Sequence, residues 1–552
     1  MGRYKKNVIH NRIYKLLAVF TFVFILLLLR LYWIQVKDHD LLYLEALKQR
    51  GKEIELYPAR GVIYDRNLIP LTNRKRVNIL LTLKDNIMED DSLKKFLLNN
   101  TSLDYLEFEK RLREANDIVE IPLKDLNFIK NGWKNVLINQ KTLRYDDNNI
   151  LSHVIGYINK SENRGESGIE RVYDDVLRNV KKEDVLFVEL DEKNNLFHDV
   201  SFNVNKREAS MEPNGVKLTI DYHIQKIVED ILDRSNLNGA VIVSDIKEGK
   251  IRALASRPNF QQADIDQYFD RNDMALYNKG IQVAYPPGSL FKLVVLAAVL
   301  EESLEVLDKI FYCNGYERVG NITINCNNRD GHGYINIKEA FSKSCNSAFI
   351  QLGRSLGGEK IIKMARKLGL GDKVNIGLLE EVEGNLPEGD ELHGPAIGNI
   401  SIGQGSIEAT PLQISNMMSI VANGGVRTGL TIIEGITNHD GYMIKGNMRD
   451  APKRVLSEEI AKLLKEFLVE VVENGTARNM DLDEVGGAGG KTGSAQAILN
   501  RKETIHGWFS GFYPKDDPKY VITVLIEEGY SGSTSAAPIF EDIAKEIEKI
   551  NR

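Results

Sequence analysis

The sequence predicts an α+β protein with one antiparallel sheet covered by helices, preceded by an extended region and an N-terminal membrane anchor. Three observations carry this prediction. An apolar run near the N-terminus is long enough to cross a bilayer. Beyond residue 210, strand-like segments occur at both ends and helical segments lie between them. Strands from both ends with helices between them favour one sheet with helical layers.

The first predicted element is a membrane-spanning helix at residues 16–36. At about 1.5 Å per residue, this run spans a hydrocarbon core of ~30 Å. Residues 1–15 form a basic tail that we expect to stay in the cytoplasm, with the catalytic part outside. No small-residue cleavage site follows the run, so an uncleaved, single-pass anchor is favoured over a signal peptide.

Residues 37–210 are charged and irregular, with short strand-like runs such as 77–82, and they predict an extended pedestal. Residues 211–552 form the predicted catalytic domain. A strand (216–220) and an amphipathic helix (223–232) open it, a strand pair follows (239–244 and 250–255), and two strands (506–512 and 520–526) and a helix (539–550) close it. The net charge of −6 gives no reason to expect a nucleic-acid partner.

Ser289 and Lys292 are the first candidate catalytic pair. Tyr285-Pro286-Pro287-Gly288 precedes them and an apolar run follows, so a helix is predicted to begin near the serine. Residues three apart lie on one helix face, which lets the lysine amine reach the serine hydroxyl. A desolvated lysine can take the serine proton, and the N–H groups at a helix start favour a developing oxyanion.

Two later motifs supply further candidates. Ser344-Cys345-Asn346 lies between predicted helices at 337–343 and 347–356, and Ser344 and Asn346 can face one cleft only at a break between those helices. Lys491-Thr492-Gly493-Ser494 follows a glycine-rich run and opens a predicted strand. At a strand edge it offers a cation for a carboxylate, a hydroxyl, and a glycine that allows close approach.

In this order, the three motifs resemble the signature of penicillin-binding proteins and serine β-lactamases. Arg60–Asn67 and the segment 168–177 resemble N-terminal motifs of class B penicillin-binding proteins, and the resemblance extends from about residue 50 to the C-terminus. Gly403-Gln404-Gly405 and the segment 508–512 are also similar to that family. Leu68 departs from it, because the family usually has glycine at this place.

The resemblance implies a transpeptidase fold for residues 211–552 and the activity of a membrane-anchored, monofunctional peptidoglycan D,D-transpeptidase. It implies that Ser289 is the nucleophile and Lys292 its base, that Ser344 and Asn346 relay protons and hold the substrate amide, and that Lys491, Thr492, Gly493 and Ser494 bind the substrate. The implied ligands are peptidoglycan stem peptides and β-lactam antibiotics, and the implied partner is a membrane glycosyltransferase. Catalysis by a serine needs no cofactor.

Other functions remain open on the sequence. A D,D-carboxypeptidase or a β-lactamase uses the same motifs, but either usually lacks a long anchored pedestal. A non-catalytic scaffold or β-lactam sensor in a wall-synthesis complex is the alternative outside enzymes. A sensor would need more membrane spans or a cytoplasmic output domain, whereas a scaffolding role can coexist with catalysis.

The three cysteines, Cys313, Cys326 and Cys345, raise a separate question. Cys313 and Cys326 flank a hairpin-like stretch, with Asp330 and His332 close behind. A disulfide between Cys313 and Cys326 is one interpretation for an extracytoplasmic domain, and free thiols are another. We favour a structural zinc site made of Cys313, Cys326, Asp330 and His332, a tetrahedral set of two thiolates, a carboxylate and an imidazole. Cys345 is interpreted as a small buried residue.

Overall fold

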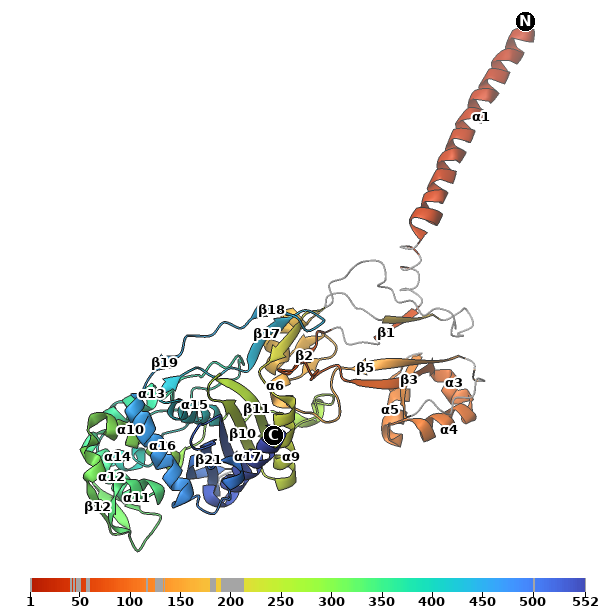
Figure 1. Cartoon of the computed structure of the whole chain (residues 1–552). Coiled ribbons are helices and arrows are strands. Elements are labelled where there is room, and N and C mark those ends of the chain that lie inside the picture. Colours follow the sequence, from red (N-terminus) through yellow and green to blue (C-terminus); the bar gives the residue numbers. More distant parts are fainter. Residues whose placement is uncertain are drawn as a thin grey trace. The chain divides into compact units, whose positions relative to one another are not determined.

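The computed structural model describes residues 2–39, 42, 45, 51–55, 60–115, 118–124, 133, 135–178, 185–189, 213–499 and 502–551 (Figure 1). Its contacts divide the chain into two compact units. The first comprises 1–59, 75–143 and 181–210, and the second comprises 60–74, 144–180 and 211–552. Two segments of the predicted pedestal therefore belong to the second unit, and the domain limits expected from the sequence stay predictions.

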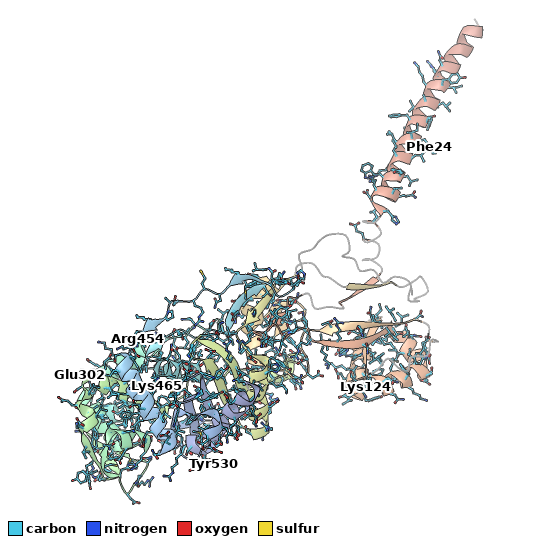
Figure 2. All side chains as sticks on the ribbon, in the orientation of Figure 1. Phe24, Lys124, Glu302, Arg454, Lys465 and Tyr530 are labelled. Atoms are coloured by element: carbon cyan, nitrogen blue, oxygen red, sulfur yellow. The ribbon has the colours of Figure 1, made fainter. Side chains whose placement is uncertain are left out.

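The first unit begins with the apolar helix α1 (Gly2–Tyr32), which continues into the π-helical turn η1 (Trp33–Lys37). Asn11–Lys37 is long and apolar enough to cross a membrane, and no other helix among the described residues is. Its apolar side chains, including Phe24, project on all sides and are exposed (Figure 2). Such a helix finds its apolar surroundings in lipid rather than in a protein core.

The rest of the first unit is a three-stranded antiparallel sheet, in the order β4-β3-β5, packed with three helices. The predicted strand at 77–82 lies within β3. Asp90 and Asp104 cap the second and third of these helices, since their carboxylates accept N–H groups of the first turns. The elements are β3 (Lys75–Leu83), α3 (Lys84–Glu89), α4 (Asp91–Asn100), α5 (Tyr105–Glu114), β4 (Ile118–Leu123) and β5 (Val136–Leu143), with a separate pair β1 (Gly51–Glu55) and β8 (Val185–Glu189).

The second unit is built on a five-stranded antiparallel sheet in the order β11-β10-β22-β21-β20. Its strands come from both ends of the unit, which confirms the predicted fold class. The last strand of the order, β20, lies at the sheet edge. The bounds are β10 (Gly239–Asp245), β11 (Lys250–Arg257), β20 (Gly489–Leu499), β21 (Lys502–Tyr513) and β22 (Tyr520–Ile526).

Helices cover this sheet and form a helical region between its strands. The helix α9 (Tyr222–Ser235) packs on α17 (Ala537–Asn551) and β11, whereas α15 (Pro411–Ala422) packs on β10 and β22. The helix α16 (Glu458–Glu473) packs on β20. The other longer elements of this region are α10 (Lys292–Glu302), α11 (Ile337–Ser342), α12 (Asn346–Leu356), α13 (Gly358–Lys367) and α14 (Ala396–Ile400), with the strands β12 (Ile310–Cys313), β13 (Tyr316–Val319), β14 (Ile322–Asn325) and β15 (Gly333–Asn336).

A second, four-stranded sheet in the order β18-β17-β9-β2 joins the segment at 60–74 to the rest of the second unit. The expected strand near 216–220 is found here rather than in the large sheet. Its strands are β2 (Ile63–Tyr64), β9 (Gly215–Leu218), β17 (Ile433–Thr437) and β18 (Met443–Gly446), and the neighbouring short elements are α6 (Ser152–Ile155), β6 (Ile158–Asn159), β7 (Arg164–Gly165), α7 (Gly168–Val172) and α8 (Asp174–Leu177).

A buried ion cluster fixes the two inserted segments to each other. Glu170, on α7, accepts Arg60 Nε at 2.8 Å and Arg144 Nε at 2.7 Å. Arg60 also pairs with Asp174 at 2.7 Å, and the Tyr145 hydroxyl donates to Glu170 at 3.0 Å. Because Glu170 and Arg60 are almost fully buried, each needs its partners to offset the cost of desolvation.

Candidate active site

Ser289 lies in a short 3-10 helix, η3 (Gly288–Phe291), and α10 begins directly after it at Lys292. The predicted helix start near the serine is confirmed, with one tighter turn at its beginning. Lys292 Nζ donates to Ser289 Oγ at 3.1 Å. Gly288 has φ +54°, and a Cβ on it would lie 2.9 Å from the Ser494 carbonyl oxygen, so η3 and β20 meet through backbone.

Ser344 and Asn346 converge on the same lysine. Ser344 has φ +56° and breaks the chain between α11 and α12, as the sequence predicted. Lys292 Nζ donates to the Ser344 carbonyl at 2.8 Å, to Ser344 Oγ at 3.1 Å and to Asn346 Oδ1 at 2.6 Å. The Asn346 amide in turn donates to the Asn325 carbonyl at 3.0 Å. The first two motifs therefore form one hydrogen-bonded group around Lys292.

The third motif lies on the edge strand β20. The buried Lys491 Nζ donates to the Thr492 carbonyl at 3.1 Å and lies 5.7 Å from the centre of the Phe341 ring. A Cβ on Gly493 would come within 2.9 Å of the Pro287 carbonyl oxygen, which brings this strand against the turn before Ser289. Ser494 Oγ accepts the Gly532 N–H at 3.2 Å.

Burial weakens the proton affinity of both site lysines. It lowers the pKa of Lys292 from 10.5 to about 8, because a buried ammonium loses its hydration. It lowers the pKa of Lys491 well below 10.5 for the same reason, and the nearby Lys292 lowers it further. Among the described residues, no carboxylate pairs with either lysine.

A second buried group of side chains supports the turn before the nucleophile. The sequence analysis did not predict this group. Glu527, just after β22, accepts Lys279 Nζ at 2.5 Å and the Tyr285 hydroxyl at 2.8 Å. The Tyr285 ring stands edge-on to Trp508, whose indole N–H donates to the Pro286 carbonyl at 3.1 Å. These contacts join β22 and β21 to the segment that carries Ser289. Their partners lie more than 200 residues apart, so no local pattern could have predicted them.

The cysteine cluster differs from the predicted set in one ligand. The ligand atoms of Cys313, Cys326, His332 and Cys345 all lie within 4.8 Å of one another. Each of the sulfurs of Cys313 and Cys326 is 3.6 Å from His332 Nδ1, and the sulfurs of Cys326 and Cys345 are 3.8 Å apart. The exposed Asp330 is outside this group. Cys345 stands in its place, because the left-handed turn at Ser344 directs the next residue to the interior.

The donor chemistry of this cluster suits a metal ion. Ligands at 2.0–2.3 Å in a tetrahedral zinc site lie about 3.5–3.8 Å apart, which matches the 3.6 Å and 3.8 Å separations. The hydrogen bond between the two thiols lowers the pKa of Cys326 and raises the pKa of Cys345, so the pair retains one proton that a bound metal ion would displace. All three cysteines are free, so the structure contains no Cys313–Cys326 disulfide.

Comparison with known protein families identifies the family of this chain. The penicillin binding protein transpeptidase domain matches residues 239–545, and the penicillin-binding protein dimerisation domain matches residues 55–206. The first match alone covers more than half of the chain. This chain belongs to the class B penicillin-binding proteins. The family and the fold expected from the sequence are thereby confirmed.

Individual relatives agree with this family. The chain is 29% identical to the stage V sporulation protein D of Bacillus subtilis, over 98% of this chain and 85% of that protein. It is 25% identical to the peptidoglycan D,D-transpeptidase MrdA of Acinetobacter baumannii, over 97% and 88% of the two chains.

Solved structures share the fold. The penicillin-binding protein PBP2 of Helicobacter pylori superposes with a TM-score of 0.67 at 23% identity, over 90% of this chain and 99% of that chain. The same protein in complex with MreC gives a TM-score of 0.65 at 22% identity, over 91% and 99%. At these identities the likeness establishes the fold of this penicillin-binding protein and nothing finer.

Proposed function

We propose that this penicillin-binding protein is a membrane-anchored peptidoglycan D,D-transpeptidase whose acyl-enzyme forms on Ser289. The observation that carries the proposal is the position of Lys292, whose amine contacts Ser289 Oγ at 3.1 Å, Ser344 Oγ at 3.1 Å and Asn346 Oδ1 at 2.6 Å. A nucleophile, a buried amine and a second hydroxyl within hydrogen-bond reach are the groups that serine acyl transfer requires.

In the first half-reaction, Ser289 Oγ attacks the penultimate D-Ala carbonyl carbon of a stem peptide, and its proton passes to the neutral amine of Lys292. A lysine with a pKa of about 8 is neutral in about one-tenth of molecules at pH 7, far more often than an exposed lysine. Terminal D-Ala leaves as the amine after receiving a proton, for which Ser344 Oγ is the relay from Lys292. The products are an ester on Ser289 and free D-Ala.

In the second half-reaction, an amine of a neighbouring stem peptide attacks the ester. It loses a proton to the Lys292 group, forms the new amide and restores Ser289. Asn346, which lies beside Lys292, is the proposed contact for the substrate amide. The backbone N–H groups of Ser289 and Ser494 are the proposed oxyanion donors.

Lys491 is the proposed anchor for the substrate carboxylate. A buried ammonium whose described partners are a carbonyl and an aromatic face is costly on its own. The carboxylate of a bound substrate would offset that desolvation cost by pairing with the ammonium. Thr492 and Gly493 line the same strand edge. Because a β-lactam carries a carboxylate next to a reactive amide, the same geometry would direct it to Ser289.

Labelling with a fluorescent penicillin tests the proposal. The wild-type chain should carry one adduct and Ser289→Ala none, whereas Ser102→Ala, an exposed serine of the first unit, should label normally. A stable adduct supports a transpeptidase. An adduct that forms and hydrolyses within minutes would indicate a β-lactamase-type hydrolase, and labelling of the Ser289→Ala variant would overturn the assignment.

Two further features of the proposal concern the membrane. The basic residues in the first half of α1 support an orientation with the N-terminus in the cytoplasm and the catalytic unit outside. A monofunctional transpeptidase needs newly polymerised glycan, so a membrane glycosyltransferase is the proposed partner. Co-purification of such an enzyme with the full-length chain would test this.

We also propose a structural zinc ion held by Cys313, Cys326, His332 and Cys345. Three thiolates and one imidazole form a closed tetrahedral set, and such a site contributes folding free energy rather than catalysis. Cys345→Ser should lose the metal measured by elemental analysis and lower the melting temperature. Asp330→Ala should retain about one equivalent of metal. Loss of metal in the Asp330 variant alone would restore the ligand set first predicted.

A further inference from the structure

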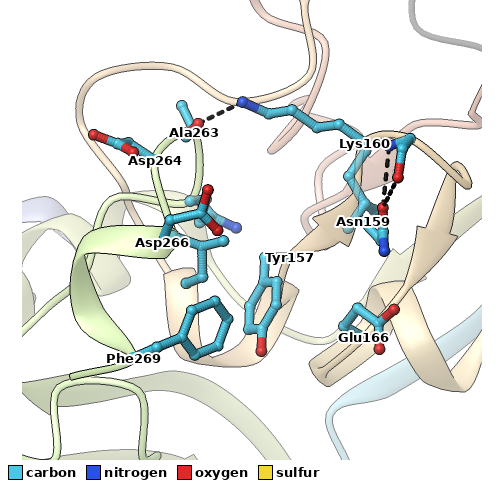
Figure 3. Close-up of a pocket in the computed structure, with 12 residues that line it drawn as sticks. Tyr157, Asn159, Lys160, Glu166, Ala263, Asp264, Asp266 and Phe269 are labelled. Atoms are coloured by element: carbon cyan, nitrogen blue, oxygen red, sulfur yellow. Dashed lines mark hydrogen bonds between the residues drawn. The ribbon is translucent and has the colours of Figure 1, made fainter. Parts of the chain in front are cut away.

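The second unit contains a cleft away from the catalytic lysines, made of two adjoining pockets. The outer pocket has a volume of about 550 Å³ and lies between the segments 157–161 and 262–269 (Figure 3). The inner pocket has a volume of about 320 Å³. Tyr157 and Glu166 line both, so the two pockets adjoin at these side chains. Its inner wall includes Asn278, on the segment that leads to Ser289.

Aromatic rings form the walls of the outer pocket. Tyr157 and Phe269 face each other across it (Figure 3), and Phe269 is 59% exposed. The Tyr157 ring is held in place by an edge-on contact with Phe260, 6.1 Å between ring centres. An exposed phenylalanine opposite a fixed tyrosine offers two apolar faces to a flat ligand between them.

The inner pocket contains a buried donor and a buried acceptor without partners. Asn278 is only 2% exposed, and its Oδ1 accepts the Gly280 N–H at 3.1 Å, but its Nδ2 has no partner. Glu380 Oε1 accepts the Gly168 N–H at 2.8 Å, and its buried Oε2 has no partner. Buried polar groups are nearly always hydrogen-bonded, so each atom calls for a polar partner, which a water molecule or a polar group of a ligand can supply.

The other polar groups of the cleft include both acceptors and a cation, because the Arg171 guanidinium also lines the inner pocket. Burial lowers the pKa of His153 to about 3, so its ring is neutral. Its Nε2 lies 2.8 Å from the Ala275 carbonyl and must carry the proton, which leaves Nδ1 as an acceptor. At the outer pocket, Asp264 and Asp266 contribute carboxylates, and the one lysine there, Lys160, donates to the Ala263 carbonyl at 2.5 Å.

These groups together select a class of ligand. The two pockets are lined by four carboxylates and two cations, Arg171 and Lys160, and this excess of carboxylates disfavours an anionic ligand. A cationic side chain would satisfy the carboxylates and the aromatic faces, but it would leave the Asn278 donor without an acceptor. A saccharide satisfies the aromatic faces, the carboxylates and the Asn278 amide together. Its ring stacks on aromatic faces, its hydroxyls donate to carboxylates, and its hydroxyl or acetamido oxygens accept from an amide.

We propose that this cleft binds the N-acetylated amino-sugar chain of the peptidoglycan strand. This inference rests on the proposed function, since it adds a glycan-binding site to the same substrate whose peptide reaches Ser289. The glycan would be held between Tyr157 and Phe269, with its polar groups toward Asn278 and Glu380.

Titration calorimetry of the full-length chain in detergent micelles with a β-1,4-linked N-acetylglucosamine oligomer tests the inference. Phe269→Ala should weaken binding about fivefold through the lost stacking face. Asn278→Asp, which keeps the Oδ1 contact but replaces the donor by an acceptor, should weaken it at least as much. Tyr442→Ala removes an aromatic side chain that is 74% exposed outside the cleft and should bind as the wild type does.

The outcomes separate this inference from the proposed function. Normal penicillin labelling of both cleft variants, with weakened sugar binding, supports a glycan site distinct from the catalytic group. No sugar binding by the wild-type chain, or binding that neither variant weakens, overturns it. Cleft-dependent binding of an arginine-rich peptide in place of the sugar also overturns it. A failure of Ser289 to label would refute the transpeptidase function instead.

Discussion

Lys292 shows how burial, rather than residue type, prepares a side chain for chemistry. An exposed lysine is protonated at neutral pH and cannot accept a proton. Here the amine is fully buried among the Ser289 and Ser344 hydroxyls and the Asn346 amide, and no described carboxylate stabilises its charge. Desolvation therefore lowers its pKa toward the range in which a general base works.

This shift predicts a pH dependence for acylation. The active form is the neutral amine, so the second-order rate constant for penicillin acylation should rise with pH and level off above the pKa of about 8. Lys292→Arg should reduce it by about 10²- to 10⁴-fold, because a guanidinium stays protonated. The measurement is stopped-flow or gel-based labelling between pH 5 and 10. A rate that is flat across pH 8 would contradict the role of Lys292 as base.

Glu527 is the buried partner of Lys279 and Tyr285, and its carboxylate can be neutralised by one substitution. Glu527→Gln leaves the Lys279 ammonium buried and unpaired, and breaking such a pair typically costs about 3–5 kcal/mol. We expect the free energy of urea unfolding to fall by about this amount, and the acylation rate to fall because Tyr285 and the turn before Ser289 lose a fixed support.

The double variant Lys279→Met with Glu527→Gln is the matched control. It removes the buried charge and still offers an acceptor to the Tyr285 hydroxyl. It should regain most of the lost unfolding free energy. If the single variant unfolds at the wild-type urea concentration, the pair contributes nothing to stability.

Residue types and spacing identified the residues grouped around Lys292 because each motif is short and continuous. The same approach failed for Asp330 and Cys345. Asp330 is close in sequence to Cys326 and His332, but its side chain is exposed. Cys345 is distant in sequence and enters the cluster only through the backbone turn at Ser344, which no spacing rule describes.

At the scale of elements, the site depends on how closely η3 approaches β20. Gly288 and Gly493 have no side chain at this junction, and a Cβ on Gly493 would be 2.9 Å from the Pro287 carbonyl and 3.1 Å from Trp508 Cβ. The strand can move away only by also moving Lys491 and Thr492. Element packing therefore sets the distance between the nucleophile and the proposed carboxylate anchor.

Gly493→Ala tests this dependence. The added methyl group should push β20 from η3, lower the unfolding free energy by about 1–3 kcal/mol and reduce the acylation rate by at least tenfold. Gly446→Ala, on the edge strand β18, has no atom within 4 Å of its added Cβ and should change neither quantity. Equal acylation rates for the two variants would show that the junction tolerates displacement.

The elements themselves were largely predictable from the sequence. Hydrophobic periods and turn signals in the sequence correctly located four strands and four helices: β10, β11, β21, β22, α9, α11, α12 and α17. The strand β9 was predicted without its partners, and the strand β2 and the helices α7 and α8 were not predicted. Their stability comes from long-range contacts such as the Arg60–Glu170 pair, 110 residues apart, and not from local preference.

At the scale of the whole molecule, the chain crosses between its two units several times. Residues 60–74 and 144–180 belong to the second unit, although they lie within the region that the sequence presents as one pedestal. Glu170 in one of these segments binds Arg60 in the other, so each insertion stabilises its counterpart. Composition could not predict this, because both segments are as charged and irregular as their surroundings.

The charge around the membrane-spanning helix predicts the orientation of the whole chain in the membrane. Five basic residues precede the span Asn11–Lys37 or lie at its start: Arg3, Lys5, Lys6, Arg12 and Lys15. Basic residues next to a membrane span favour the cytoplasmic side. Protease added outside protoplasts should therefore degrade the penicillin-labelled unit and spare an epitope fused before Gly2. Replacing the five basic residues by glutamine should weaken this orientation and protect part of the labelled unit. Digestion of the N-terminal epitope with survival of the labelled unit would reverse the proposed topology, and labelled protein released into the medium would show that the helix is cleaved.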